Sequence, residues 1–192
     1  MYIKVIAFPT RIGPATPISA RCPACGQLGT FNWIEEPIDT IIQDQQGMIR
    51  LGQRICPNPK CKAHLFVGIR NKELVISYPP TQIDFDISNL PEAIVNTLKE
   101  AIICHANGCY IAAAIMVRKT FEVLCDERQI KGNNLKEKID SLKNSLSIAP
   151  ALLDGLHDLR LLGNDAAHIN SNTYVSIGQN EVAIAIDITK EI

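Results

Sequence analysis

Four cysteines arranged in two pairs constrain this chain more than any other feature. The first pair is Cys-Pro-Ala-Cys at residues 22–25, the second is Cys-Pro-Asn-Pro-Lys-Cys at residues 56–61, and thirty residues separate them. Each pair can form a tight turn that directs two thiolates at one point, and two such turns supply the four sulfur ligands that zinc prefers. The sequence therefore predicts one zinc site made of Cys22, Cys25, Cys56 and Cys61.

The predicted zinc is structural, because four protein ligands leave no open coordination position for a substrate or water. The surrounding segment has few large apolar residues, so metal binding is expected to supply much of its folding free energy, about 10–16 kcal/mol in small zinc peptides. His64, three residues after Cys61, is an alternative ligand in place of one cysteine. The pattern leaves open whether such a ribbon covers the rest of the protein or binds nucleic acid or another protein.

The remaining cysteines, Cys104, Cys109 and Cys125, lie in segments with helical periodicity. A second metal site from Cys104, His105 and Cys109 would lack a fourth ligand, so we interpret all three cysteines as small apolar core residues. An odd total of seven cysteines without a secretion signal fits a reducing compartment.

Charge and hydropathy narrow the class of protein further. The formal net charge of −1 and the pI near 6.4 argue against a strongly basic nucleic-acid binder. No apolar run reaches the roughly 18 residues that a membrane span needs, and the amino-terminal residues lack the charged start of a signal peptide. We therefore expect a cytoplasmic protein with no membrane partner.

The sequence changes character near residue 80. Before it, short apolar runs broken by Gly and Pro predict strands at 2–7, 27–34 and 47–55, and a hairpin over 64–79 with its turn near Asn71 and Lys72. After a proline-containing linker, apolar residues at helical spacing predict helices at about 90–107, 109–128 and 134–146, and a fourth from 149–150. We predict two domains, a zinc-ribbon-like β domain at 1–80 and a helical bundle at 81–192.

Short connections between the predicted helices imply antiparallel neighbours. The predicted fold class is therefore α+β, a small amino-terminal zinc-ribbon β region followed by a mainly antiparallel four-helix bundle. Residues 180–192 are ambiguous: Val182, Ile184, Ile186 and Ile188 alternate as in a strand, whereas Val182, Ala185, Ile186 and Thr189 fit one face of a helix. We favour the helix.

The string RLLGNDAAH at residues 160–168 places polar side chains among apolar ones at the end of the fourth predicted helix. His157, Asn164 and His168 share a stripe with Arg160, and Asp165 lies beside it. In one straight helix Arg160 and His168 would be about 12 Å apart along the axis.

Arg118 and Glu122 form a second polar feature, an i, i+4 pair surrounded by apolar residues. We expect a partly buried pair that bonds internally or to the polar stripe, because a buried charge needs a partner. The alternative is a solvated surface pair, worth about 0.3–0.5 kcal/mol.

Three segments, RKTFEVL, NNLKEKIDSL and LHDLRLLGNDAAH, in this order and spacing, resemble the family called domain of unknown function 4145, over about residues 85–170. The cysteine pairs resemble the zinc-ribbon-like segment often found in front of that domain. The resemblance implies an association with bacterial defence, because family members are attached to restriction-endonuclease subunits and other defence proteins. The family is also similar to the higher-eukaryote-and-prokaryote nucleotide-binding (HEPN) helical bundles, many of which are metal-independent ribonucleases with an active site formed across a dimer.

Carried over onto this sequence, the arginine and histidine of the HEPN motif fall on Arg160 and His168. The resemblance implies that His168 removes a proton from a ribose 2′-hydroxyl while Arg160 stabilises the phosphoryl oxygens. Asn164 would then orient the histidine or the phosphate, and Asp165 would hold the imidazole tautomer. Seven residues separate the pair where the motif has four to six, and Leu161 follows the arginine where a polar residue is common, which weakens the catalytic interpretation.

Two functions follow from this resemblance. The first is an accessory or interaction module of bacterial antiphage defence, which acts as a homodimer or by binding a partner protein or a nucleotide. The alternative is a metal-independent endoribonuclease, a toxin or antiphage effector that acts on RNA. The sequence leaves open whether the chain is an enzyme.

Overall fold

The computed structural model describes residues 7–145, 154–158, 160–161 and 177–191. The chain divides into two compact units, Met1–Gln82 and Ile83–Ile192. The first unit consists of strands and the second of helices, so each is described by itself.

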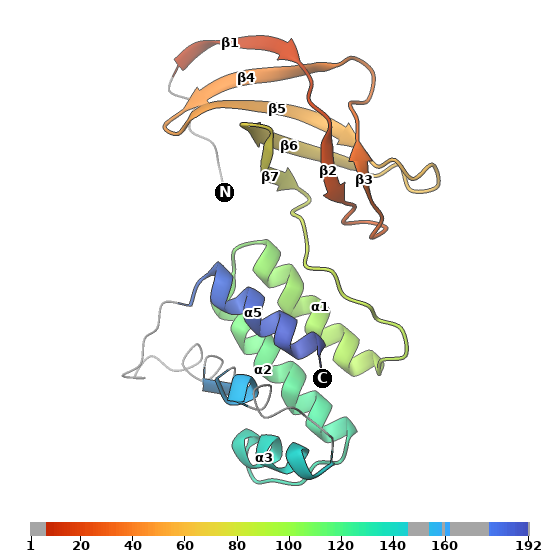
Figure 1. The fold of residues 1–192 in the computed structure, drawn as a ribbon, viewed down its shortest axis with the longest axis vertical. Coiled ribbons are helices and arrows are strands. Elements are labelled where there is room, and N and C mark those ends of the chain that lie inside the picture. The colour runs from red at the N-terminus through yellow and green to blue at the C-terminus, as the bar shows by residue number, and fades with distance from the viewer. Residues whose placement is uncertain (1–6, 146–153, 159, 162–176, 192) are drawn as a thin grey trace. The chain divides into compact units, whose positions relative to one another are not determined.

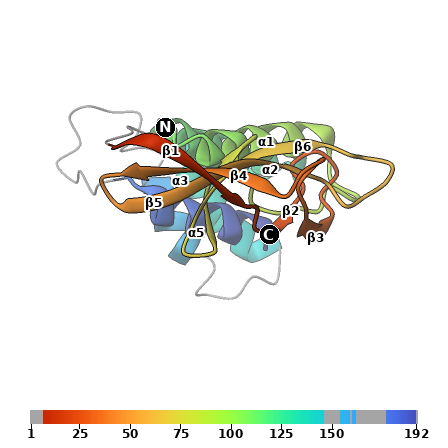
Figure 2. The same ribbon diagram turned by 90° about the horizontal axis from the view of Figure 1, so that it is seen from above.

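A five-stranded antiparallel sheet forms most of the first unit, in the order β1-β4-β5-β6-β7 (Figure 1). Neighbouring strands β1, β4 and β5 lie side by side in both views (Figures 1 and 2). A separate two-stranded hairpin, β2 with β3, is inserted between β1 and β4. The strands are β1 (Ala7–Pro14), β2 (Ile18–Arg21), β3 (Leu28–Phe31), β4 (Ile38–Asp44), β5 (Gly47–Ile55), β6 (His64–Arg70) and β7 (Glu73–Tyr78).

Buried and exposed side chains alternate at the start of β6, and the buried ones pack with the hairpin. Leu65 and Val67 are buried while Phe66 between them is exposed, because successive side chains of a strand point to opposite faces. The buried residues form a core with the hairpin, whose members are Ile18, Ala20, Cys22, Phe31, Cys56, Leu65, Val67 and Ile69. The hairpin therefore packs against the buried side chains of β6.

The β6–β7 connection is the turn that the sequence predicted. Asn71 and Lys72 have φ values of 50° and 69°. Positive φ at both central residues is the conformation that a two-residue hairpin requires, since it matches the twist of the flanking strands. The prediction of this hairpin is confirmed.

A buried ion pair connects three segments of the first unit. Arg54 on β5 donates to both carboxylate oxygens of Asp39 on β4, at 2.9 and 2.6 Å. Its Nε and Nη2 also donate to the carbonyl of Thr16, between β1 and β2, at 3.0 and 2.8 Å. Both charged side chains are fully buried, and these bonds compensate for their removal from water.

Helices α1 (Glu92–Ala106), α2 (Tyr110–Glu127), α3 (Leu135–Ser145) and α5 (Gln179–Lys190) form the second unit, with further helical residues at 154–158 and 160–161. Helix α1 packs mainly on α2, α5 packs on both, and α3 packs on α2. Their shared core includes Leu98, Val117, Phe121, Ile139, Leu142, Leu156 and Ile186.

The predicted fold class, a small zinc ribbon followed by an antiparallel four-helix bundle, is wrong. The structure is α+β, but its amino-terminal region is a five-stranded sheet with a separate hairpin. The described helices are short and do not form a clear four-helix bundle. Helix periodicity identifies apolar faces but not which faces meet, and α5, which follows the four predicted helices in the chain, packs on α1 and α2.

Residues 179–190 form a helix, so the helical alternative for this segment is confirmed. Val182, Ala185, Ile186 and Thr189 are its buried residues. Gly178 is the N-cap, and its N–H donates to Glu181 Oε2 at 3.1 Å, which satisfies one free donor of the helix end. Apart from Ala7, the strand predicted at 2–7 lies outside the described residues.

Candidate metal centre

The first cysteine turn connects β2 to β3. Cys22 follows the last residue of β2, its N–H donates to the carbonyl of Gln27, and its own carbonyl accepts the N–H of Gly26, both at 2.9 Å. Gly26 has a φ of +73°, which a residue with a side chain rarely adopts. This backbone conformation holds Cys22 and Cys25 at one end of the hairpin.

The second cysteine turn connects β5 to β6 and is held by Asn58. The carbonyl of Asn58 accepts the N–H groups of Cys61 and Lys62 at 3.0 Å. Its side-chain oxygen accepts the N–H of Lys60 at 3.0 Å, and its Nδ2 lies 3.7 Å from the Sγ of Cys25. Sequence reasoning missed this residue, although its position between two prolines in the turn was a usable signal.

The two turns bring all four cysteine sulfurs within 4.8 Å of one another, an arrangement that can bind a metal ion. The sulfurs of Cys22 and Cys61 are 3.8 Å apart, as are those of Cys25 and Cys56. Zn–S bonds of about 2.3 Å place two sulfurs of a tetrahedron about 3.8 Å apart, whereas a disulfide would join them at about 2.05 Å. The spacing fits a tetrahedral metal site and not a pair of disulfides.

The pKa values of these thiols differ across the site. The backbone N–H of Gln27 stabilises the thiolate of Cys25 and lowers its pKa to about 7. Burial raises the pKa of Cys56 to about 12. A cation at the centre of the cluster would allow the buried thiol to ionise as well, since metal binding releases protons from thiol ligands.

The alternative ligand His64 is not part of this cluster. Its Nδ1 lies 3.1 Å from Nε2 of Gln53, on the neighbouring strand β5. The group of candidate ligands in the described part of the chain contains only the four cysteines.

Of the four residues of the predicted catalytic stripe, only Arg160 is described. Asn164, Asp165 and His168 lie outside the described residues. The backbone carbonyl of Arg160 accepts a hydrogen bond from Arg118 Nη1 at 3.3 Å, and the buried Nε of Arg160 has no hydrogen-bond partner among the described residues.

The Arg118–Glu122 pair is partly buried, as predicted. Nε of Arg118 and Oε1 of Glu122 are 3.3 Å apart, with exposed side-chain fractions of 26% and 34%. Because Arg118 also reaches the carbonyl of Arg160, the pair joins α2 to the start of the stripe. His157, which also belongs to the stripe, lies 3.0 Å from Asp140 of α3.

The prediction that all three other cysteines are core residues is wrong for Cys109. Cys125 is fully buried, but Cys104 is only partly buried and Cys109 is exposed. Cys109 lies in the turn between α1 and α2, where side chains face solvent more often than within a helix.

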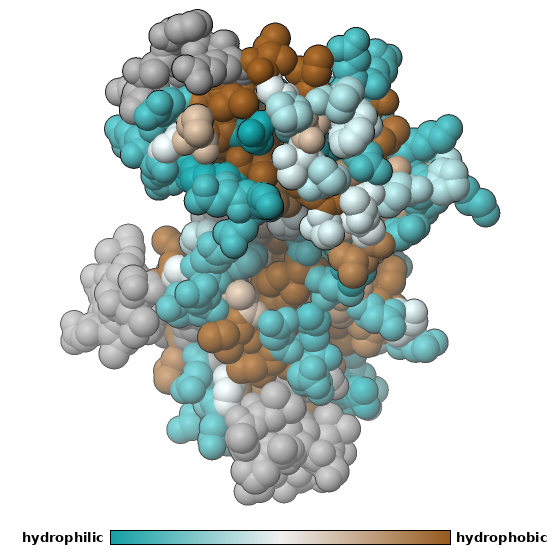
Figure 3. All heavy atoms as spheres, turned by 45° about the horizontal axis from the view of Figure 1, so that its top comes forward, coloured by the Kyte–Doolittle hydropathy of each residue, from teal (hydrophilic) through white to brown (hydrophobic). Residues whose placement is uncertain are grey.

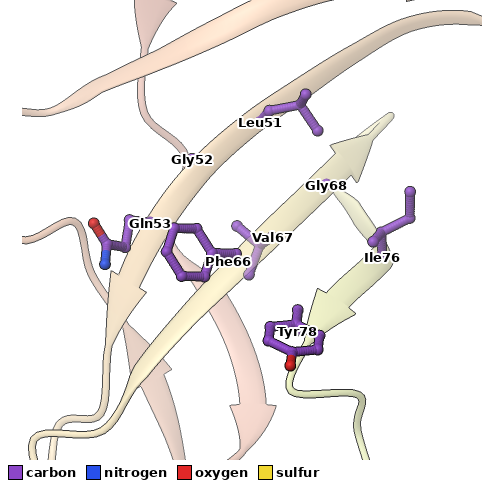
Figure 4. Close-up of a pocket in the computed structure, with 8 residues that line it drawn as sticks. All are labelled: Leu51, Gly52, Gln53, Phe66, Val67, Gly68, Ile76 and Tyr78. Atoms are coloured by element: carbon purple, nitrogen blue, oxygen red, sulfur yellow. The ribbon is translucent and has the colours of Figure 1, made fainter. Parts of the chain in front are cut away.

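An apolar groove lies over β5, β6 and β7 and has a volume of about 410 Å³ (Figure 4). Its lining is mostly apolar, and its polar side chains are Gln53 and Tyr78. Its lining residues are Leu51, Gly52, Gln53, Phe66, Val67, Gly68, Ile76 and Tyr78. Apolar side chains also reach the surface elsewhere (Figure 3), and exposed examples are Ile12, Leu28 and Met48.

Residues 99–192 match the model of a family described as Domain of unknown function (DUF4145). The match covers the three sequence segments that carry the family resemblance and does not extend to the cysteine turns. No curated protein and no solved structure matches the chain. None of the helices in the described part of the chain has the length and apolar character that crossing a bilayer requires.

Proposed function

We propose that this chain, whose residues 99–192 carry the DUF4145 match, is a binding module whose β unit is held together by one structural zinc ion. Cys22, Cys25, Cys56 and Cys61 would be its ligands. One observation carries the proposal: the two sulfur–sulfur distances of 3.8 Å, each between cysteines from different turns, agree with the edge of a zinc–thiolate tetrahedron.

Bound zinc would supply a rigid cross-link and no catalytic step, because all four coordination positions are filled by thiolates. The cross-link would join the β2–β3 turn to the β5–β6 turn. Since the hairpin shares a small core with the buried side chains of β6, this link would hold the hairpin and the sheet together at that core.

Metal counting tests the proposal. The purified wild type should contain one zinc per chain, and Cys22→Ser should lose it. Cys125→Ser is the matched control, because that thiol is buried in the helical unit and should leave the zinc content unchanged. Wild-type protein that is refolded with zinc and still binds none would refute the site.

We further propose, on the family resemblance alone, that the helical unit acts in bacterial defence by forming a homodimer or by binding a partner protein or nucleotide. Light scattering of the purified chain tests the dimer. A monomer at all concentrations would exclude the homodimer and leave the other two partners to be tested.

Endoribonuclease activity is the second candidate function. Its support is the contact of Arg118 with the backbone carbonyl of Arg160, together with the buried Nε of Arg160, which lacks a partner among the described residues. Cleavage of RNA without divalent metal, lost in His168→Ala with the fold intact, would establish it. Equal cleavage by that variant would identify a contaminant.

A further inference from the structure

The turn at the carboxyl end of α1 joins the backbones of two cysteines. The N–H of Cys109 donates to the carbonyl of Cys104 at 2.9 Å, and the N–H of Gly108 donates to the carbonyl of His105 at 3.0 Å. Gly108 has a φ of +75°. These two hydrogen bonds and the left-handed glycine define a Schellman motif, whose first and last side chains commonly contact each other. In this chain both of those side chains are cysteines.

Solvent can reach this pair, since Cys109 is exposed and Cys104 is partly buried. Burial raises the pKa of Cys104, and the nearby Cys109 raises it further. Cys109 is also the N-cap residue of α2, and its side chain makes no capping hydrogen bond. The two thiols therefore differ, and Cys109 is the better placed to react first with a reagent from solvent.

We propose that Cys104 and Cys109 form a thiol pair that hydrogen peroxide oxidises reversibly to a disulfide. The thiolate of Cys109 attacks one peroxide oxygen, the O–O bond breaks, and a sulfenic acid and water form. The sulfur of Cys104 then attacks the sulfur of Cys109, the S–O bond breaks, and a second water leaves. Two thiols and one peroxide give one disulfide and two waters, and a dithiol reductant reverses the reaction.

The cysteine pair lies beside the start of α5. His105, between the two cysteines, has its Nε2 3.0 Å from the carbonyl of Gln179, the first residue of α5. The turn therefore lies where the end of α1 and the starts of α2 and α5 meet. A disulfide there would covalently fix the joint between the two helices with the most extensive contact in this unit.

Peptide mapping of the full chain in its metal-loaded form tests the proposal. Lys99 and Arg118 flank both cysteines with no other lysine or arginine between them, so one tryptic peptide, residues 100–118, carries the pair. After peroxide treatment and alkylation, this peptide should have lost the mass of two hydrogen atoms and carry no alkyl group. Dithiothreitol should restore both alkylation sites. Two thiols that alkylate fully, or that gain oxygen independently, would overturn the proposal.

Three variants test the proposal further. Cys104→Ser should leave a sulfenic acid on Cys109 that dimedone labels, and Cys125→Ser should form the disulfide as the wild type does. Gly108→Ala retains both thiols but strains the turn at φ +75°, so its disulfide should form several-fold more slowly. An unchanged rate in Gly108→Ala, with the fold intact by circular dichroism, would show that the turn does not bring the thiols together.

Discussion

The ion pair between Arg54 and Asp39 lies directly over the α-carbon of Gly52. A Cβ added to Gly52 would be 1.9 Å from Oδ1 of Asp39 and 2.7 Å from Nη1 of Arg54. Both distances are far below van der Waals contact, and Arg54 is fully buried with its bonds to Asp39 and Thr16 in place. The absence of a side chain at residue 52 therefore makes room for the buried charges that join β4 to β5.

Gly52→Ala should destabilise the first unit by about 1–3 kcal/mol, because an added methyl group in a packed site forces neighbouring groups to move. The neighbouring groups here are charged and cannot separate without losing hydrogen bonds. Urea unfolding followed by the fluorescence of Trp33 would measure the change. Gly47→Ala is an informative comparison: its open surroundings exclude a clash, so any cost there would come from its φ of +113°.

Asp39→Asn should cost about 3–5 kcal/mol, since the substitution leaves the buried guanidinium of Arg54 without its counter-charge. Asp44→Asn provides the control, because Asp44 pairs with Arg70 at side chains that remain 16–17% exposed and more exposed pairs contribute about 0–1 kcal/mol. Equal losses in the two variants, measured by denaturant unfolding, would contradict a special role for the buried pair.

Removal of the metal should loosen the first unit and leave the second folded. The sulfur cluster joins the two turns of the first unit, whereas the core of the second unit contains none of these four cysteines. Hydrogen exchange before and after chelation should show lost protection at residues 18–31 and 56–64, with unchanged protection in α1 and α2. A loss of protection throughout both units would show that the metal stabilises more than its own unit.

Ile186→Ala should destabilise the helical unit by about 2–5 kcal/mol, as expected for truncation of a fully buried side chain. Ile184→Ala is the matched control on the same helix, because Ile184 is 59% exposed and exposed substitutions usually change stability by about 0.5 kcal/mol or less. Thermal unfolding of both variants would measure the difference. Similar values for the two would mean that α5 is not held by the face that the structure buries.

The features that sequence predicted correctly depend on residues close together in the chain. Cysteine spacing indicated the two turns, the apolar pattern indicated β5 and the β6–β7 hairpin, and 3.6-residue periodicity gave α1, α2 and α3 to within a few residues. Each of these signals is complete within a short window of sequence.

The features that sequence reasoning missed depend on contacts between residues that are distant in the chain. Asp39 and Arg54 look like surface residues when taken singly, and each can be buried only because the other is present. Strand β4 was missed for this reason, since a buried Asp39 interrupts its apolar pattern. The prediction of a four-helix bundle failed for a similar reason. The sequence of a single helix does not show that α5 packs on α1 and α2.

The insertion of the β2–β3 hairpin between β1 and β4 determines the order in which the sheet can assemble during synthesis. Strands β4, β5, β6 and β7 pair with one another in chain order and can form from local hairpins as they leave the ribosome. Strand β1 precedes β4 in the chain but cannot pair until β4 has been synthesised. Residues 15–37 must then form a loop that brings the two strands together. Closing that loop costs entropy that the local hairpins avoid, so β1 joins the sheet after β4 has formed, although it precedes β4 in the chain.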